Sequence, residues 1–487
     1  MEGNCQVKHH HRLRACAAAA ALLAALPALA EDIVIDNVTV VDGTGKPKQA
    51  GMSVGIDKGR ITFVTPTAVA PKVSGRHIDG TGKFVMPGLM DVHIHLKGIR
   101  GDAQRMVGKG PEGGPEQTEL TKLAPQVPQT ESRASHDAGV AALASYLYSG
   151  VTTVYDAGNT VEHIMPLRAA ERAGTILAPH IFATGPIVTF PGSHGDGVGL
   201  AFRIASWPAD KEKFDRYLEE VKPDIVKLTL EEHGWGTRPL IPMLPLDLMQ
   251  ELIMEANRYG IRTTAHTSSE LRATEAIFTG IDSLAHPVIQ GPITPEFARL
   301  MGAKKTPMAT TLTIGEGYSR LVEHPEFLDQ PLYQASFSPA EINEMRNVTA
   351  PAWKARGWTW WMKLMTPIAQ ENLRQIWAAG GIVAIATDQT SGPAVHREME
   401  LMQSAGVPAA DVLVMATLNG AKHLGKDRDM GSVETGKIAD LLLLAADPTA
   451  DVNNVKQIVW VMKEGRLIDE DKLPLAGGKR PLRRPER

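Results

Sequence analysis

The sequence predicts an α/β fold: a (β/α)8 TIM barrel with a small β-sandwich domain built from both chain ends. Three observations support this prediction. Eight short apolar runs alternate with helix-like stretches through the middle of the 487-residue chain, and glycine-rich β runs occupy both ends. Alternating strands and helices are typical of a parallel sheet closed into a barrel, with a doubly wound open sheet as the alternative.

The eight runs are rich in β-branched or other apolar residues, as buried parallel strands require. The predicted strands are Met90–His95, Thr152–Asp156, His180–Thr184, Ile225–Leu230, Arg262–His266, Ser283–His286, Pro307–Leu312 and Ile382–Asp388. Helix-like stretches such as His136–Ser149 and Leu246–Tyr259 lie between most of them. Eight βα units therefore fit into residues 87–427, which we assign to the barrel.

A long segment at about 314–366 interrupts this alternation and carries four tryptophans: Trp353, Trp358, Trp360 and Trp361. We expect a helical insertion that covers the barrel mouth. Its tryptophans either form an aromatic lid or pack the insertion itself, and packing is the favoured reading.

Both ends of the chain have the character of short β-strands. From Ile33 onward, β-branched runs are separated by glycines, as hairpins require, and Asp440–Leu444 and Gln457–Met462 resume the pattern. We therefore assign residues 31–86 and 428–475 to one small β-sandwich domain.

The first 30 residues have the features of an export signal. Lys8, Arg12 and Arg14 precede the apolar run Ala15–Leu26, which is too short to span a membrane, and Ala28-Leu29-Ala30 matches a cleavage site. We expect a secreted or periplasmic protein without stable membrane insertion after cleavage. The alternative is an uncleaved membrane anchor.

Composition excludes several functional classes. The two cysteines, Cys5 and Cys16, both lie in the signal, so the mature chain has no thiol for a disulfide or a nucleophile. The formal net charge is −4 without a long basic stripe, which argues against a nucleic-acid partner.

Polar side chains lie in or at the ends of several of the predicted apolar strands. In a barrel, the carboxyl ends of the strands face the active site. His93 and His95 are two apart and so point to one face of a strand, where two imidazoles can chelate a cation. The other members of this set are Lys227, His266, His286 and Asp388.

Each of these residues also has a purely structural explanation. A single histidine can be a hydrogen-bonded core residue, an aspartate can cap the next helix, and Lys227 can form a simple ion pair. A buried ammonium ion is costly, so Lys227 would persist if neutralised, paired or chemically altered. Six aligned strand positions make the joint coincidence improbable.

The motifs resemble the amidohydrolase superfamily, in the branch of imidazolonepropionase-like and prolidase-like enzymes. The resemblance spans the mature chain. It rests on the six residues, on His-x-His after Pro87–Asp91, on Gly150–Asp156 and on Gly436–Asp440.

This resemblance implies two divalent metal ions, with zinc as the favoured metal. His93, His95 and Asp388 would bind one ion, His266 and His286 the other, and a carbamylated Lys227 would bridge them. A metal-bridging hydroxide would attack an amide bond in a peptide, acyl amino acid or cyclic amide. Asp388 would shuttle the proton as general base and acid.

Loop residues are weaker candidates for substrate contacts. His194 resembles a residue of a substrate-contacting loop in this branch and could polarise the scissile carbonyl, although it could equally be incidental. His233, Trp235 and Arg238 follow the fourth strand, where prolidase-like relatives usually place a tyrosine. No tyrosine follows Lys227 at a comparable distance, which weakens an exopeptidase interpretation.

Two other functions stay open. The same site could hydrolyse lactones or organophosphate triesters, since loops set the pocket shape. A non-catalytic periplasmic ligand-binding protein is the alternative from another class. In each case we expect a small-molecule partner, and a homo-oligomer is possible.

Overall fold

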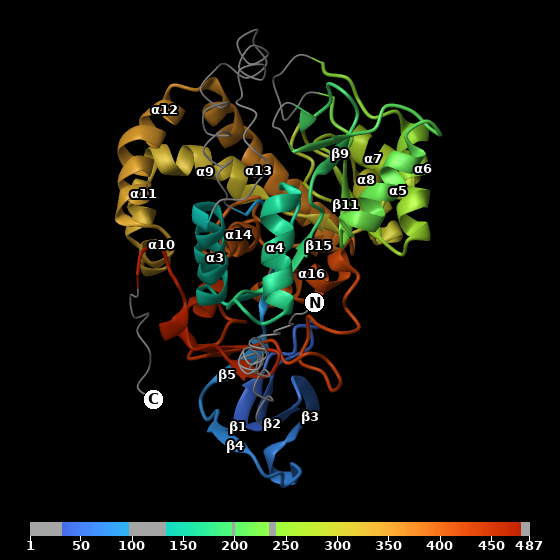
Figure 1. Ribbon diagram of the computed structural model, residues 1–487. Coiled ribbons are helices and arrows are strands. Elements are labelled where there is room, and N and C mark those ends of the chain that lie inside the picture. The colour runs from blue at the N-terminus through green and yellow to red at the C-terminus, as the bar shows by residue number, and fades with distance from the viewer. Residues whose placement is uncertain (1–31, 97–132, 197–199, 233–239, 479–487) are drawn as a thin grey trace, which may run out of the picture.

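The computed structural model describes residues 32–96, 133–196, 200–232 and 240–478. Figure 1 shows a body of helices packed around parallel strands, with a separate sheet at one end of it. Strands from the start and the end of the chain lie together in that sheet.

The body contains two parallel sheets. One has the order β6-β7-β8 and the other β10-β9-β11-β12-β13-β14-β15. Their bounds are β6 Leu89–Ile94, β7 Val151–Asp156, β8 His180–Ala183, β9 Ile187–Thr189, β10 Ala201–Arg203, β11 Ile225–Thr229, β12 Arg262–His266, β13 Ser283–Leu284, β14 Met308–Ala309 and β15 Val383–Ala384. Each of the eight predicted strands overlaps one of these, so the α/β class is confirmed.

Backbone hydrogen bonds also join the two sheets to each other. The Asp224 N–H, just before β11, donates to the carbonyl of Ala183 in β8 at 2.9 Å. At the other side, the Val92 N–H in β6 donates to the Ile385 carbonyl, just after β15, at 3.2 Å. The first and the last strands of the body are therefore neighbours.

Helices follow most of these strands and bury one apolar face against them. α5, for example, buries Phe214, Tyr217 and Leu218. The helices outside the 312–378 segment are α3 Arg133–Tyr148, α4 Val161–Arg172, α5 Lys211–Glu220, α6 Leu246–Arg258, α7 Glu270–Phe278, α8 Pro295–Lys304, α14 Pro393–Ser404, α15 Ala409–Met415 and α16 Leu418–Leu424.

The segment 312–378 is helical almost throughout. It contains α9 Leu312–Glu323, η3 Pro325–Asp329, α10 Pro331–Ser336, α11 Pro339–Glu344, η4 Met345–Thr349, α12 Ala350–Lys354 and α13 Gly357–Ala378. Trp358 stacks on Trp361 with ring centroids 4.9 Å apart, and Trp353 packs against Tyr318 at 4.5 Å. At least three of its tryptophans thus pack against other aromatic rings of the segment.

The separate sheet has eight strands in the order β18-β17-β16-β5-β1-β2-β3, with β4 paired to β1. Their bounds are β1 Ile33–Val40, β2 Gln49–Asp57, β3 Arg60–Pro66, β4 Arg76–Asp79, β5 Phe84–Pro87, β16 Leu441–Leu444, β17 Ile458–Lys463 and β18 Arg466–Leu467; short helical turns are η1 Thr67–Val69, η5 Val452–Lys456 and η6 Glu470–Lys472. β5 lies between β1 and β16, and only Gly88 separates β5 from β6.

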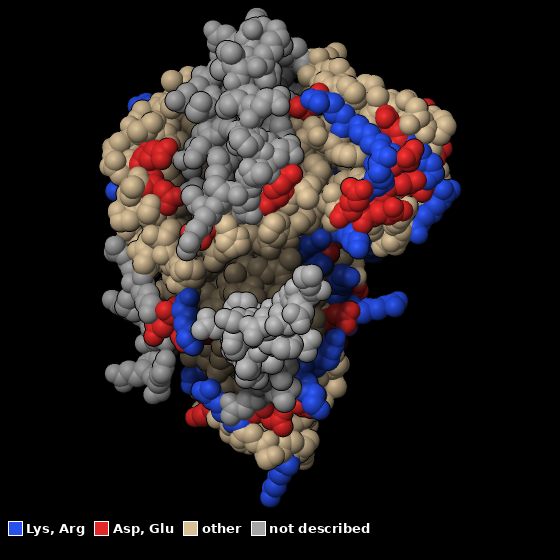
Figure 2. All heavy atoms as spheres, viewed as in Figure 1, with Lys and Arg blue, Asp and Glu red and all other residues tan. Residues whose placement is uncertain are grey.

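The surface carries both signs of charge. On the face seen in Figure 2, acidic and basic side chains are interspersed in the region of α5 and α6, and α5 contains the ion pairs Lys211–Asp215 and Arg216–Glu212. Among the residues that the structure describes, no helix combines the length and apolar character needed to cross a membrane. The expected signal, residues 1–30, lies outside the described residues.

Candidate metal centre

Two histidines at the end of β6 present the same ring nitrogen to the centre of the body. Nδ1 of His93 lies 2.8 Å from the Ala285 carbonyl, and Nδ1 of His95 lies 2.7 Å from the Gly158 carbonyl. A carbonyl accepts only from a protonated Nδ1, so Nε2 keeps its lone pair in both rings. Burial lowers the pKa of His93 well below its usual range and that of His95 to about 3, so both rings are neutral.

Asp388 joins these two rings from the chain after β15. Its backbone has a φ of 53°, in the left-handed region, and its N–H donates to the His93 carbonyl at 2.7 Å. This places a carboxylate oxygen 3.3 Å from Nε2 of His95 and 3.8 Å from Nε2 of His93. One ligand atom from each residue lies within 4.8 Å of the others, an arrangement that could hold a metal ion. Burial raises the pKa of Asp388 to about 7, although the positive charge of Lys227 lowers it.

Lys227 extends this cluster from the middle of β11. Its side chain is buried, and Nζ lies 2.9 Å from Nε2 of His93. Burial lowers the pKa of the amine to about 8, although the carboxylates of Asp388 and Asp156 oppose that shift. The costly buried cation expected from the sequence is therefore partly neutralised by its surroundings.

A second group of histidines adjoins the first. The ring centroids of His93 and His286 are 4.5 Å apart, and those of His286 and His266 are 4.3 Å apart. Nδ1 of His286 lies 2.9 Å from the Thr311 hydroxyl, while the His194 ring stacks on His266 at 3.9 Å. Burial lowers the pKa of both His266 and His286 well below the usual range.

The structure thus brings the six strand residues of the sequence prediction into one cluster, with His194 beside it. The three other loop candidates, His233, Trp235 and Arg238, lie outside the described residues.

Two buried carboxylates of this region were not singled out from the sequence. Asp156 ends β7 and accepts hydrogen bonds from the Leu96 and Gly158 N–H groups at 2.7 and 3.1 Å; burial raises its pKa to about 6. Glu231 follows β11, with a carboxylate oxygen 3.8 Å from Nε2 of His266. The signal that could have revealed both is an acidic residue at or just beyond the carboxyl end of a barrel strand.

Comparison with known proteins supports the same interpretation. The model of the Amidohydrolase family matches residues 84–468. An imidazolonepropionase from Shouchella clausii is 25% identical over 473 residues, covering 89% of this chain and 91% of the relative. A 5-methylthioadenosine/S-adenosylhomocysteine deaminase from Symbiobacterium thermophilum is 24% identical, with coverages of 91% and 94%.

Solved structures show the fold. A molinate hydrolase has a TM-score of 0.69 at 22% identity, covering 94% of this chain and all of that one. A putative prolidase from Bifidobacterium longum has a TM-score of 0.64 at 23% identity, with coverages of 91% and 95%. These likenesses indicate a TIM barrel with a small β domain.

Proposed function

The chain belongs to the amidohydrolase family and is a hydrolase of carbon–nitrogen bonds, and from this premise we propose that it uses two metal ions to cleave an amide bond of a small-molecule substrate. The observation that carries the proposal is the cluster of His93, His95 and Asp388, whose ligand atoms lie within 4.8 Å of one another.

The chemistry of the donor set fits metal ions. Neutral imidazoles with a fixed tautomer are good ligands, and in metal sites the far ring nitrogen usually donates to a carbonyl, carboxylate or water. His93 and His95 have this arrangement, with carbonyl acceptors at Nδ1. His93, His95 and Asp388 would hold one ion and His266 and His286 the second, and histidine and carboxylate ligands favour zinc.

Lys227 would supply the bridging ligand after carbamylation. Burial lowers the pKa of its amine and so favours the neutral form, which is the form that reacts with carbon dioxide. The product is an anion, so a buried cation beside two candidate ion sites is replaced by a group of the opposite charge. Metal ions favour that anion, because burial of a charge is tolerated only when it is paired.

When bound, paired ions lower the pKa of water and polarise a carbonyl oxygen. Asp388 is the residue of this chain that we assign to proton movement: its carboxylate would accept the proton of the attacking water and pass it to the leaving nitrogen. His194 is assigned to the substrate carbonyl, since its ring stacks directly on His266 at the edge of the cluster. We also propose that His233, Trp235 and Arg238 contact the substrate.

The proposal includes the architecture and the place of action. We propose that the parallel strands close into a (β/α)8 barrel at residues 87–427 and that residues 31–86 and 428–475 form a β-sandwich domain. We further propose export, with residues 1–30 removed as a signal. Mature protein from the exported fraction would then begin at Glu31 by amino-terminal sequencing, and an unprocessed start would contradict export by this route.

The names of the similar proteins support the amide reaction. They include imidazolonepropionases, a Xaa-Pro dipeptidase, molinate hydrolase and phenylurea hydrolase B. The test combines metal analysis of zinc-replete protein with a panel of dipeptides, acyl amino acids, cyclic amides, lactones and organophosphates. We expect about two zinc equivalents and turnover of the amides. Fewer than one equivalent would refute the two-metal site, and turnover confined to the lactones or organophosphates would refute the amide assignment.

A further inference from the structure

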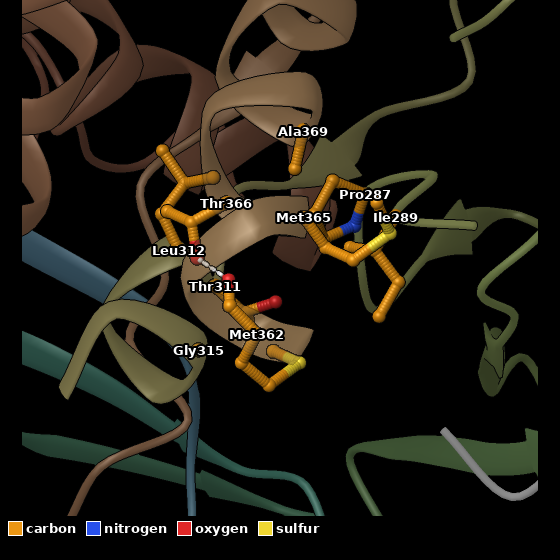
Figure 3. Close-up of a pocket in the computed structure, with 9 residues that line it drawn as sticks. All are labelled: Pro287, Ile289, Thr311, Leu312, Gly315, Met362, Met365, Thr366 and Ala369. Carbon is orange, nitrogen blue, oxygen red and sulfur yellow. Dashed lines mark hydrogen bonds between the residues drawn. The ribbon is translucent and has the colours of Figure 1, made fainter. Parts of the chain in front are cut away.

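Close packing surrounds the candidate metal ligands on the side of His286. Figure 3 shows an apolar cavity there, between the chain after β13, α9 and α13. It has about 10 Å³ of space for water-sized molecules, which is enough for about one water. Thr311 lines it and also lies 2.9 Å from Nδ1 of His286. On this side the packing itself leaves the His286 ring little room to move.

The ring of His95 depends more on a single hydrogen bond. The His95 side chain is 26% exposed, whereas that of His93 is 1% exposed. A half-buried histidine ring can turn about its χ2 angle, which has a broad energy minimum, unless a ring nitrogen is bonded. Nδ1 of His95 donates to the Gly158 carbonyl at 2.7 Å. The position of that carbonyl therefore sets the direction in which Nε2 points.

Gly158 carries this carbonyl in the chain after β7, and Asp156 holds it there. The Gly158 N–H donates to Oδ1 of Asp156 at 3.1 Å. The glycine also packs closely on the ring, because a Cβ atom at this position would lie 3.0 Å from Cε1 of His95 and 2.7 Å from a carbon of Ile187. Gly158 is thus fixed at its N–H by Asp156 while its carbonyl is bonded to His95.

The second oxygen of Asp156 holds the chain on the other side of His95. Oδ2 accepts from the Leu96 N–H at 2.7 Å, and Leu96 directly follows His95. The amide of Asn159 donates both to this oxygen and to the Leu96 carbonyl, each at 3.0 Å. Asp156 is itself fully buried and pairs in register with Ile94 of β6. One carboxylate therefore fixes both the segment that carries the ring and the segment that carries its acceptor.

We propose that Asp156 is a positioning residue for metal binding. Through the backbone at Gly158 and Leu96, it fixes the ring of His95 so that Nε2 faces the ion. The inference rests on the proposed function for the metal ions. A carboxylate suits this task, because its two oxygens accept several N–H groups and need to donate none. Hydrogen bonds to a charged acceptor are also stronger than neutral ones.

The Nδ1–H proton of His95 reports the orientation of the ring directly. In full-length protein with isotope-labelled histidine, its NMR signal is assigned by its disappearance in His95→Gln. We expect slow exchange with water in the wild type. In Asp156→Asn the exchange should be about tenfold or more faster, since an amide has one acceptor oxygen and loses the charge-assisted bonds. An unchanged exchange rate in this variant would contradict the assignment.

Zinc affinity, measured by competition with a chromophoric chelator, tests whether Asp156 acts through His95. Loss of an outer partner of a metal ligand costs about 10- to 100-fold in affinity, and we expect a loss of this size in Asp156→Asn. In a His95→Gln background, the same substitution should change the affinity by less than about twofold. Equal losses in the two backgrounds would show that Asp156 does not act through the His95 ring.

Asp282→Asn is the matched control. Asp282 lies just before β13, at the opposite end of the strands from the cluster, and its Oδ2 accepts from the N–H and the hydroxyl of Thr263 at 2.8 and 3.1 Å. We expect its zinc affinity to equal that of the wild type. An equal loss in Asp282→Asn and Asp156→Asn would reduce the role of Asp156 to general stability and would overturn the proposal.

A milder variant covers the case in which Asp156→Asn does not fold. Asn159→Ala removes the amide that ties Asp156 to the Leu96 carbonyl. We expect a loss of about tenfold in zinc affinity that again requires His95. Unchanged affinity in this variant would contradict the proposal.

The two proposals fail in different ways. If the wild type binds two zinc ions and hydrolyses amides, but Asp156→Asn changes neither the proton exchange nor the zinc affinity, the positioning role is refuted and the proposed function stands. If the wild type binds no zinc, the proposed function fails. The exchange of the His95 proton then decides alone whether Asp156 orients the ring.

Discussion

The amine of Lys227 lies 2.9 Å from Nε2 of His93, although 134 residues separate them in the chain. Nε2 is the nitrogen that keeps its lone pair, because Nδ1 is bonded to the Ala285 carbonyl. The amine of Lys227 and the metal-binding nitrogen proposed for His93 thus lie side by side in the interior. We therefore expect carbamylation of Lys227 and metal binding by His93 to depend on each other.

Replacement of Lys227 by alanine tests this link. We expect activity to fall by about 100-fold or more, since loss of even an outer-shell partner of a metal costs 10- to 100-fold. Added short-chain carboxylic acids should restore part of it by occupying the vacated position. The measurement is turnover of the best amide with and without acetate or propionate. Full activity without rescue would remove Lys227 from the mechanism.

Thr311→Val tests the orientation of His286. The variant removes the hydroxyl that lies 2.9 Å from Nδ1, and we expect zinc affinity to fall by about 10- to 100-fold. Competition with a chromophoric chelator measures it. Thr310→Val is the control, because Thr310 is also buried but its hydroxyl bonds to the Ala386 backbone. Equal zinc affinity in all three proteins would contradict an orienting role for Thr311.

Zinc should also stabilise the folded protein. Ions that bind only the native state add about 2.7 kcal/mol at a free concentration 100 times Kd. Calorimetric scans of protein stripped with a chelator should therefore show a Tm several degrees lower than scans after zinc is restored. The His93→Ala variant should lose most of that difference. The same Tm with and without zinc in the wild type would argue against a structured site.

A buried charge cluster between the body and the separate sheet predicts a pH dependence of stability. His180 of β8 lies 3.0 Å from Asp440 and 3.4 Å from Glu171. Burial lowers the pKa of His180, but the two carboxylates outweigh it and raise the pKa to about 9. A raised pKa in the folded state gives stability that is complete below about pH 6.5 and is lost as the pH rises through about 9.

The His180→Gln variant isolates this contribution. Between pH 6.5 and 9.5 the wild type should lose on the order of 3 kcal/mol more unfolding free energy than the variant. Urea titrations at several pH values measure this difference. His324→Gln is the control, since His324 is exposed beside Glu326. Parallel pH curves for the wild type and His180→Gln would show that the cluster does not titrate as expected.

Much of the fold and of the candidate site was predictable, because polar residues lie at the ends of the apolar strands. A hydrophobic core alone gives no reason for polar residues at these positions. His93, His95, His266, His286 and Asp388 follow from the rule that the carboxyl ends of barrel strands meet. The alternation of strands and helices is encoded locally, so eight of the ten described body strands were predictable to within a few residues, whereas the short strands β9 and β10 were missed.

The partners of these residues were not predictable. The carbonyls of Ala285 and Gly158 that orient His93 and His95 belong to distant segments, and every residue carries a carbonyl, so no residue type marks them.

The pairing of β5 with β16 has a consequence for biosynthesis. β5 is made before its antiparallel neighbour at residues 441–444, and the whole body lies between the two in the chain. Only Gly88 separates β5 from β6, the strand that leads into His93 and His95. Until residues 441–444 have been synthesised, β5 has an open edge on that side, and an unpaired strand edge favours aggregation.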